Sequence, residues 1–243
     1  MHLVVDIGNT RVKLACFDGK NMVYYHQGLR DDLIEIPDLV SDFGHISAAI
    51  YTPSSYENSK FLDVISFIPR VLKLTHETAV PIKNGYHSPK TLGMDRLAAA
   101  VGASTRYPDA HTVVVDMGTC ITMDYIEKGG IYWGGNISPG VPMRLEAMHQ
   151  YTSALPLVSI QIPFGILGTD TTSALQQGGV KGACREIEAF LNEVFLEYGN
   201  VNVILTGGDA HIFESYTKKQ IFVLPYLVME GLNEILHYNV SKI

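Results

Sequence analysis

The sequence lacks the short motifs that identify several common enzyme classes. Its 243 residues contain no GxxxxGK[ST] phosphate loop, no GxGxxG turn, no HExxH zinc motif and no CxxC pair. The three cysteines are odd in number and far apart, which argues against a disulfide framework or a zinc site. The nine histidines are scattered, so a histidine metal cluster has no support either. We therefore expect reduced thiols, as in a cytoplasmic protein.

The chain also lacks a long apolar run and an excess of positive charge. No window approaches the roughly 20 apolar residues that a membrane-spanning helix needs, and the first segment reaches Asp6 too early for a signal peptide. The 18 Lys+Arg against 25 Asp+Glu give a formal charge of −7, which is unlike a nucleic-acid binder. We expect a soluble cytoplasmic protein without a membrane or nucleic-acid partner. An anionic ligand is not excluded, because backbone amides can hold phosphate locally.

What is present indicates a globular α/β protein. The composition, 47% hydrophobic and 18% charged, is enough for a sizeable core. Short β-branched runs that end at an acid or a glycine predict strands at Leu3–Ile7, Val113–Met117 and Val201–Leu205. After a Gly8-Asn9 turn, Arg11–Phe17 alternates apolar and polar residues, which predicts a strand with one wet face. Helices are expected at about 55–67, 94–106, 142–151, 171–198 and 226–237.

An internal echo gives the domain organisation. The string Val-Val-Asp-Ile-Gly-Asn-Thr at 4–10 recurs as Val-Val-Asp-Met-Gly-Thr-Cys at 114–120. Both copies read as a strand, an acid, an apolar residue, a glycine, a small polar residue and a further strand. The echo predicts a duplicated domain with equivalent turns facing each other, and domain limits of 1–109 and 110–243.

Each echoed turn has the residue types of a polyphosphate site. Glycine lets the backbone approach a ligand, and neighbouring N–H groups can point at phosphate oxygens. The carboxylate of Asp6 could hold a hydrated Mg²⁺, and Lys13 would add positive charge. Alternatively, the first copy is only a tight hairpin closed by an Asx side chain.

A third turn, at 205–210, again follows a strand and precedes an expected helix. Its Gly207-Gly208 pair would let an adenine and a ribose pass close to the backbone. The alternative is an ordinary turn in which Asp209 caps the helix.

These three turns resemble the phosphate 1, phosphate 2 and adenosine loops of the superfamily of acetate and sugar kinases, heat-shock ATPases and actin. Specific strings narrow the resemblance to the type III pantothenate kinases, and it spans roughly residues 3–210. In the family's order, the strings are Asp6-Ile7-Gly8-Asn9-Thr10, Gly93-Met94-Asp95-Arg96, Asp116-Met117-Gly118-Thr119, Gly135-Asn136-Ile137-Ser138-Pro139-Gly140 and Gly168-Thr169-Asp170-Thr171. Cys120 and Met94 depart from the residues expected in many relatives, and both changes concern packing only.

The resemblance implies two duplicated ribonuclease H-like (actin-like ATPase) domains with an interdomain cleft. It implies transfer of the γ-phosphoryl of ATP to pantothenate, giving 4'-phosphopantothenate, the first step of coenzyme A biosynthesis. Mg²⁺ and a monovalent cation, K⁺ or NH₄⁺, would be required. The protein would be a homodimer in which the neighbouring subunit partly closes the pantothenate pocket.

Residue by residue, the resemblance makes Asp95 the general base and Asp116 the ligand of the monovalent cation, with Asp6 holding Mg²⁺ through water. The residues implied to contact ATP are Asp6, Ile7, Gly8, Asn9, Thr10, Arg11, Val12, Lys13 and Thr119. The residues implied to contact pantothenate are Tyr86, Gly93, Met94, Asp95, Arg96 and Thr171.

Each of these roles has a simpler competitor. Asp95 could be an acid favoured in the first turn of a helix, and Thr171 is one of four candidate N-caps at 169–172. Tyr86 lies in a turn-rich loop and could be a surface aromatic, while Ser138 is expected to serve as a helix cap before Pro139. Two rival functions stay open: a kinase of the same superfamily with another small acceptor, and a non-enzymatic transcription accessory factor.

Overall fold

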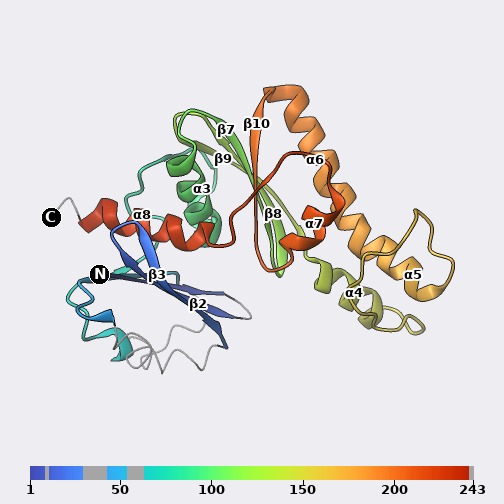
Figure 1. Ribbon diagram of the computed structural model, residues 1–243, viewed down its shortest axis with the longest axis horizontal. Helices are drawn as coiled ribbons and strands as arrows, with labels where there is room; N and C mark the ends of the chain where they lie inside the picture. Colours follow the sequence, from blue (N-terminus) through green and yellow to red (C-terminus); the bar gives the residue numbers. More distant parts are fainter. Residues whose placement is uncertain (9–10, 30–42, 54–62, 241–243) are drawn as a thin grey trace. The chain divides into compact units, whose positions relative to one another are not determined.

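The computed structural model describes residues 1–8, 11–29, 43–53 and 63–240, and it is mixed α/β with two sheets (Figure 1). The strands are β1 (His2–Ile7), β2 (Val12–Asp18), β3 (Asn21–Gly28), β4 (Ala48–Tyr51), β5 (Val71–Lys73), β6 (Lys83–Asn84), β7 (His111–Met117), β8 (Cys120–Glu127), β9 (Ile131–Pro139), β10 (Val201–Thr206) and β11 (Phe222–Val223). The helices are η3 (Pro89–Thr91), α3 (Met94–Arg106), α4 (Val141–Gln150), α5 (Thr171–Gln176), the π-helical η4 (Gln177–Lys181), α6 (Gly182–Tyr198), α7 (Ala210–Tyr216) and α8 (Leu227–Val240).

The chain forms two compact units that do not simply follow one another in sequence. The first unit comprises Met1–Asp109, Ile126–Trp133 and Tyr226–Ile243, and the second comprises Ala110–Tyr125 and Gly134–Pro225. The domain limits expected from the sequence, 1–109 and 110–243, agree with a boundary between residues 109 and 110. They do not include 126–133 and 226–243 in the first domain. Those limits stay a prediction.

The first unit is built on a five-stranded sheet with the order β3-β2-β1-β4-β5. The β1–β2 hairpin is antiparallel and places Asp6 opposite Lys13, whereas β4 runs parallel to β1. One face of the sheet carries a core that includes Val5, Leu14 and Ile65. The other face lies under α8, which packs on β1, β2 and β4 and against α3 (Figure 1).

The expectation that β2 keeps one face wet is wrong over most of its length. Ala15 and Phe17 alternate with the core residues Leu14 and Cys16, yet both are fully buried. The reason is the position of the strand: β2 lies between β1 and β3, and α8 covers the second face. Only Lys13, near the hairpin turn, is half-exposed on that side.

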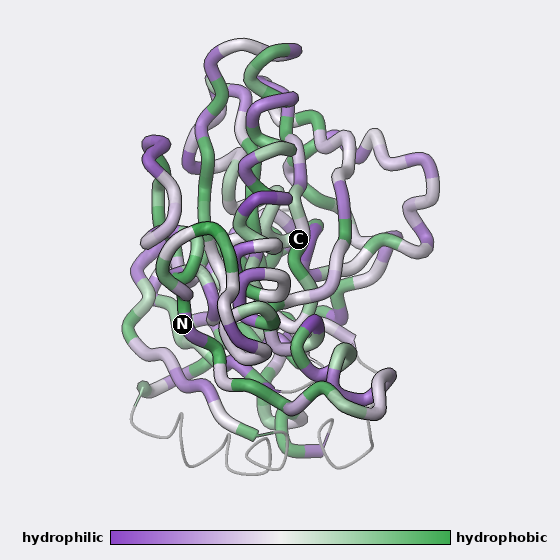
Figure 2. Tube along the Cα trace, turned by 90° about the vertical axis from the view of Figure 1, so that its right-hand side faces the viewer, coloured by the Kyte–Doolittle hydropathy of each residue, from purple (hydrophilic) through white to green (hydrophobic). Residues whose placement is uncertain are grey.

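The second sheet has the order β11-β10-β7-β8-β9-β6, and most of it belongs to the second unit. Its β10 runs parallel to β7, so that Thr206 pairs with Asp116 at the ends of the two strands. The apolar face of α6, with Ile187 and Leu191, packs into the core over these strands. Hydrophobic and hydrophilic residues alternate along much of the trace (Figure 2), as expected for elements with one buried face.

Most helices expected from the sequence are present. The predictions at 94–106, 142–151 and 226–237 are confirmed as α3, α4 and α8 within a few residues. The long helix at 171–198 is also present, but after its first six residues it widens into the π-helical η4 and then continues as α6. The helix expected at 55–67 lies mostly outside the described residues. In the described part of the chain, no helix is long and apolar enough to cross a membrane.

Candidate active site

The first echoed turn buries its acid and gives it two side-chain partners. Asp6 stands near the end of β1, where the Thr52 hydroxyl donates to its Oδ1 at 3.0 Å. The same hydroxyl accepts from the N–H of Ile7 at 2.8 Å. Lys13, opposite Asp6 on β2, places its Nζ 3.7 Å from Oδ2. The turn itself closes through a bond from the N–H of Gly8 to the carbonyl of Arg11.

Burial is the main influence on this carboxyl group. Desolvation raises the pKa of Asp6 above its ordinary 3.8, against the opposing effect of the Lys13 charge. The negative charge of Asp95 raises that pKa further, while the Thr52 hydrogen bond lowers it. The charge of Asp95 therefore acts on the Asp6 carboxyl, and both acids belong to the first unit. Acids whose pKa is shifted by burial and by neighbouring charges are frequent at functional sites.

Asp95 stands exposed in the first turn of α3, as the sequence suggested. Its Oδ1 accepts from the N–H of Arg96 at 2.8 Å, which fixes the orientation of the carboxylate. Gly93 is the N-cap, and a Cβ at that position would lie only 2.5 Å from the Asp95 Oδ1. The glycine therefore leaves the space into which the carboxylate folds back.

The loop before α3 brings an aromatic surface to the same helix end. The Arg96 guanidinium is buried, with its Cζ 5.6 Å from the centre of the Tyr86 ring, and Tyr86 in turn lies 6.1 Å from the Tyr132 ring. The N–H of Tyr86 donates to Asn84 Oδ1 at 3.0 Å. Tyr86 is thus half-buried beneath a cation and is not a loose surface aromatic.

The second echoed turn lies between β7 and β8 in the second unit. It is closed by a bond from the N–H of Gly118 to the carbonyl of Cys120, so only Thr119 separates the bonded residues. Thr119 is exposed at the tip, and its carbonyl accepts from the N–H of Gly140 at 3.0 Å. The string at 135–140 therefore packs directly against this turn.

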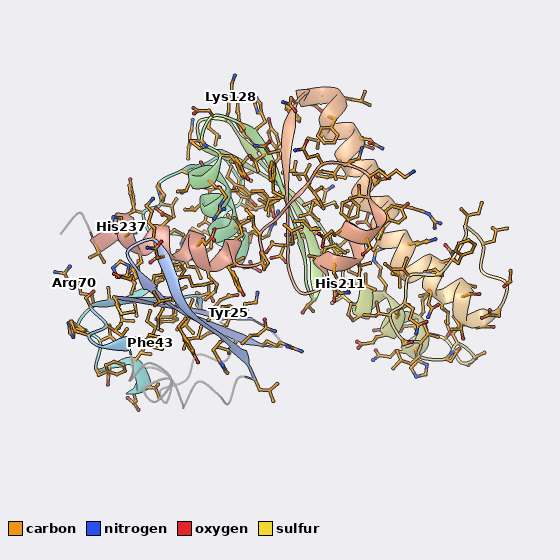
Figure 3. The ribbon with its side chains drawn as sticks, viewed as in Figure 1. Tyr25, Phe43, Arg70, Lys128, His211 and His237 are labelled. Carbon is orange, nitrogen blue, oxygen red and sulfur yellow. The ribbon has the colours of Figure 1, made fainter. Side chains whose placement is uncertain are left out.

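The third turn supports the second acid from the neighbouring strand. Gly207 has φ +94°, and a Cβ there would lie 2.4 Å from the Met117 carbonyl and 2.5 Å from Asp116 Oδ1. Only glycine fits this position. Asp209 occupies the N-cap position of α7, but its side chain makes no capping hydrogen bond to α7. Burial raises the pKa of Asp209, and His211, labelled on α7 in Figure 3, lowers it.

One of the four candidate caps at 169–172 is confirmed, whereas the cap expected at Ser138 is wrong. The α5 N-cap is Asp170, whose Oδ1 accepts from the N–H of Ser173 in a reciprocal capping box, so Thr171 is free of that task and lies exposed in the first turn. Ser138 does not cap α4, because the N-cap is Gly140. Instead, the Ser138 hydroxyl accepts from Arg144.

The remaining residues predicted to contact ATP or pantothenate differ in how exposed they are. Ile7 and Val12 are buried and Arg11 is exposed, so of these three only Arg11 has a side chain that solvent reaches freely. Asn9 and Thr10 lie outside the described residues, and Met94 is half-buried. Thr52 was missed by sequence reasoning, since nothing local marks a threonine 46 positions from the acid that it contacts.

The described residues contain no group of three or more His, Cys, Asp and Glu side chains fit to enclose a metal. A Mg²⁺ that keeps its waters and binds mostly through phosphates needs only one carboxylate, and Asp6 with Lys13 nearby fits that mode. The Asp116 Oδ1 and the Met117 carbonyl oxygen both lie close to Gly207, and oxygen atoms are the ligands that hard cations take.

Comparison with known proteins identifies the family. The type III pantothenate kinase family matches over residues 2–193. A type III pantothenate kinase of Phocaeicola vulgatus is 39% identical, covering 98% of this chain and 99% of that protein. One from Flavobacterium johnsoniae is 36% identical over the full length of both.

Solved structures agree on the fold. A Campylobacter jejuni protein described as a Baf family transcriptional activator has a TM-score of 0.66 at 20% identity, over 98% of this chain and 99% of that one. The activator of the 2-hydroxyisocaproyl-CoA dehydratase of Clostridium difficile, solved with bound ADPNP, has a TM-score of 0.56 at 13% identity, over 99% and 94%. These likenesses confirm the ribonuclease H-like (actin-like ATPase) fold. The chain belongs to the type III pantothenate kinase family.

Proposed function

We propose that this protein transfers the γ-phosphoryl group of ATP to the terminal hydroxyl of pantothenate, giving 4'-phosphopantothenate for coenzyme A biosynthesis. The observation that carries the proposal is that one unit holds both Asp95 and Asp6, and that the charge of Asp95 acts on the Asp6 carboxyl. One acid is exposed and oriented, and the other is buried beside a lysine. Phosphoryl transfer needs positioning and charge neutralisation more than covalent help, which suits this arrangement.

In this proposal Asp95 accepts the proton of the attacking hydroxyl. An exposed carboxylate whose Oδ1 is fixed by the N–H of Arg96 can face the acceptor without reorienting. Gly93, Met94 and Arg96 bind the acceptor around it, and Tyr86 adds an aromatic wall that Arg96 holds in place. A carboxylate or amide of the acceptor is the natural partner of such a guanidinium.

The nucleotide is assigned to the three glycine turns. The residues proposed to contact the phosphates are those from Asp6 to Lys13, and Thr119 is proposed to contact ATP. Asp6 would hold Mg²⁺ through its water shell, and that positive charge would neutralise the phosphates. Asp116 would hold K⁺ or NH₄⁺ through its carboxylate, with the Met117 carbonyl oxygen close by.

We further propose a cytoplasmic homodimer. The segment before α5 exposes several large apolar side chains, which a solitary subunit would present to water. They are Tyr151, Leu157, Ile162, Phe164, Ile166 and Leu167. A second copy would cover them, and Thr171, exposed just beyond, would then reach the partner's pantothenate pocket. Three free cysteines, two of them buried, are consistent with a reducing compartment.

A coupled assay of ADP release tests the function. We expect turnover that requires pantothenate and that falls when Na⁺ replaces K⁺. The Asp116→Asn variant should lose this preference for K⁺. The Asp6→Asn variant should be less active, but its remaining activity should still depend on K⁺. Turnover with a different small alcohol, and none with pantothenate, would favour another kinase of the superfamily.

A transcription accessory role is the second candidate, favoured by the fold likeness to the Campylobacter jejuni protein. The presence of Asp6, Asp95 and Asp116 together favours the kinase, because a regulator has no need of an oriented general base. An Asp95→Asn strain that keeps the full phenotype of the wild type would reverse that preference.

A further inference from the structure

The segment that packs on the second turn is held from behind by one arginine. Arg144 lies one turn into α4, and its guanidinium folds back over the residues that precede the helix. Its Nε donates to the carbonyl of Pro139 at 2.8 Å, and its Nη2 donates to the Ser138 hydroxyl at 3.2 Å. The Arg144 side chain is only 20% exposed. A planar fork of donors suits such a task, since it can hold several acceptors at fixed angles.

A glutamate on another helix holds that arginine in turn. Glu186 on α6 pairs with Arg144 through Nη2 and Oε2. Burial opposes ionisation of this acid, but hydrogen bonds from Ser138 and Arg144 outweigh it, so the pKa of Glu186 lies below its ordinary value. Ser138, Arg144 and Glu186 thus form a hydrogen-bonded triangle. Glu186 anchors it on α6, whose apolar face packs in the core of the second unit.

The near side of this triangle touches the proposed nucleotide turn. Gly140 follows Pro139 directly and donates its N–H to the Thr119 carbonyl. A Cβ on Gly140 would lie 2.2 Å from the Gly118 carbonyl oxygen and 2.5 Å from that of Thr119. The backbone of Gly140 therefore contacts the backbone of Gly118 and Thr119 directly, with no side chain between them. A shift of Pro139 must pass to the turn, because the contact has no room to absorb it.

We propose that Arg144 and Glu186 are positioning residues for ATP: they clamp the 138–140 segment against the Gly118–Thr119 turn and so set where Thr119 meets the nucleotide. The inference rests on the proposed function, in which Thr119 contacts ATP. Neither residue touches the nucleotide in this proposal. Small displacements of a positioning group can cost large factors in binding and rate, so the effect is measurable.

The experiment compares Arg144→Met, Arg144→Lys and Glu186→Gln by titration with a non-hydrolysable ATP analogue and by steady-state kinetics. We expect Arg144→Met to weaken analogue binding and to raise the KM for ATP about tenfold, while the KM for pantothenate changes less than about twofold. Arg144→Lys keeps the positive charge but not the planar set of donors. Its affinity for the analogue should therefore lie between those of wild type and Arg144→Met. Glu186→Gln should shift the same parameters in the same direction by a smaller factor.

Neighbouring positions on α6 supply matched controls. Arg185 donates to the carbonyl and side chain of Gln177 within the same helical run, and Glu188 accepts from Thr217. Arg185→Met and Glu188→Gln should leave analogue affinity unchanged. Unchanged affinity in Arg144→Met would overturn the inference, as would equal rises in the KM for both substrates, even if thermal stability fell. A wild-type protein that binds no analogue would instead refute the proposed function.

Discussion

The two echoed turns share a sequence pattern but treat their acids differently. In the first, Asp6 is buried and held by the side chains of Thr52 and Lys13. In the second, Asp116 is half-exposed, and its oxygen lies against the backbone of Gly207 from a neighbouring strand. The first acid is held by two side chains, whereas the second lies against the backbone of a glycine. A repeated motif therefore predicts a repeated turn but not a repeated environment.

The lengths of the turns differ in the same way. Two residues separate the bonded pair Gly8 and Arg11, whereas Thr119 alone separates Gly118 and Cys120. The first turn therefore has two residues between its bonded ends, and the second has Thr119 alone. This fits the proposal that the first turn serves phosphates along a whole segment and the second serves ATP through Thr119.

The largest expected effect comes from Asp95, the acid whose charge acts on Asp6 in the first turn. Asp95→Asn should lower kcat by about 10²–10⁴, the range for loss of a general base, with ATP binding little changed. Because the Asp95 charge raises the pKa of Asp6, the variant should also lower that pKa. Rapid-quench kinetics measures the fall in kcat, and a nucleotide titration measures the affinity for ATP. An equal loss of ATP affinity would point to a structural role for Asp95.

A smaller effect tests the crowding around the second acid. Gly207→Ala adds a Cβ at 2.4–2.5 Å from Met117 and Asp116 and strains a backbone at φ +94°. We expect a loss of about 1–3 kcal/mol in the free energy of unfolding, together with weaker K⁺ activation. Gly208→Ala is the matched control, because its Cβ meets nothing within 4 Å. Chemical denaturation of both variants decides the matter, and equal losses would contradict the crowding argument.

The smallest effect concerns the stability cost of burying Asp6. A carboxyl whose folded pKa is raised above 3.8 stabilises the fold least when it is ionised, so stability is lost as pH rises through the folded pKa. Without nucleotide, Asp6→Asn should therefore melt higher than wild type at pH 7–8. Each 1 kcal/mol corresponds to about 2–4 °C for a chain of this size. The difference should vanish below pH 3.8, and a variant that melts lower at pH 8 would show that Lys13 outweighs burial.

The sequence predicted the elements that carry chemistry better than the contacts that tune them. The strands before Asp6 and Asp116 and the helix after Gly93 were predictable, because β-branched runs and helical periodicity are local signals. The burial of Ala15 and Phe17 was not, since it depends on a helix more than 200 positions away. The contact of Thr52 with Asp6 was not predictable either, because the two residues are 46 positions apart in the sequence.

Aromatic contacts show a similar limit. The Tyr25 ring, labelled in Figure 3, lies 4.7 Å from that of Tyr226, and its hydroxyl donates to Gln27. Burial raises the pKa of Tyr25, against the opposing charge of Lys13. Tyr25 therefore lies near the first turn, yet no local pattern in its strand marks it.

The crossing of α3 and α8 has a consequence for the order in which the molecule can be assembled. A Cβ at Gly231 would lie 1.8 Å from the Ala98 carbonyl oxygen, so the two helices meet backbone to backbone. The helix α8 begins only at Leu227, about 120 positions after α3 ends. During synthesis, the helix that bears Asp95 can make this contact only after α8 has been made. A fragment ending at 109 would leave Val4 and Phe17 without their cover.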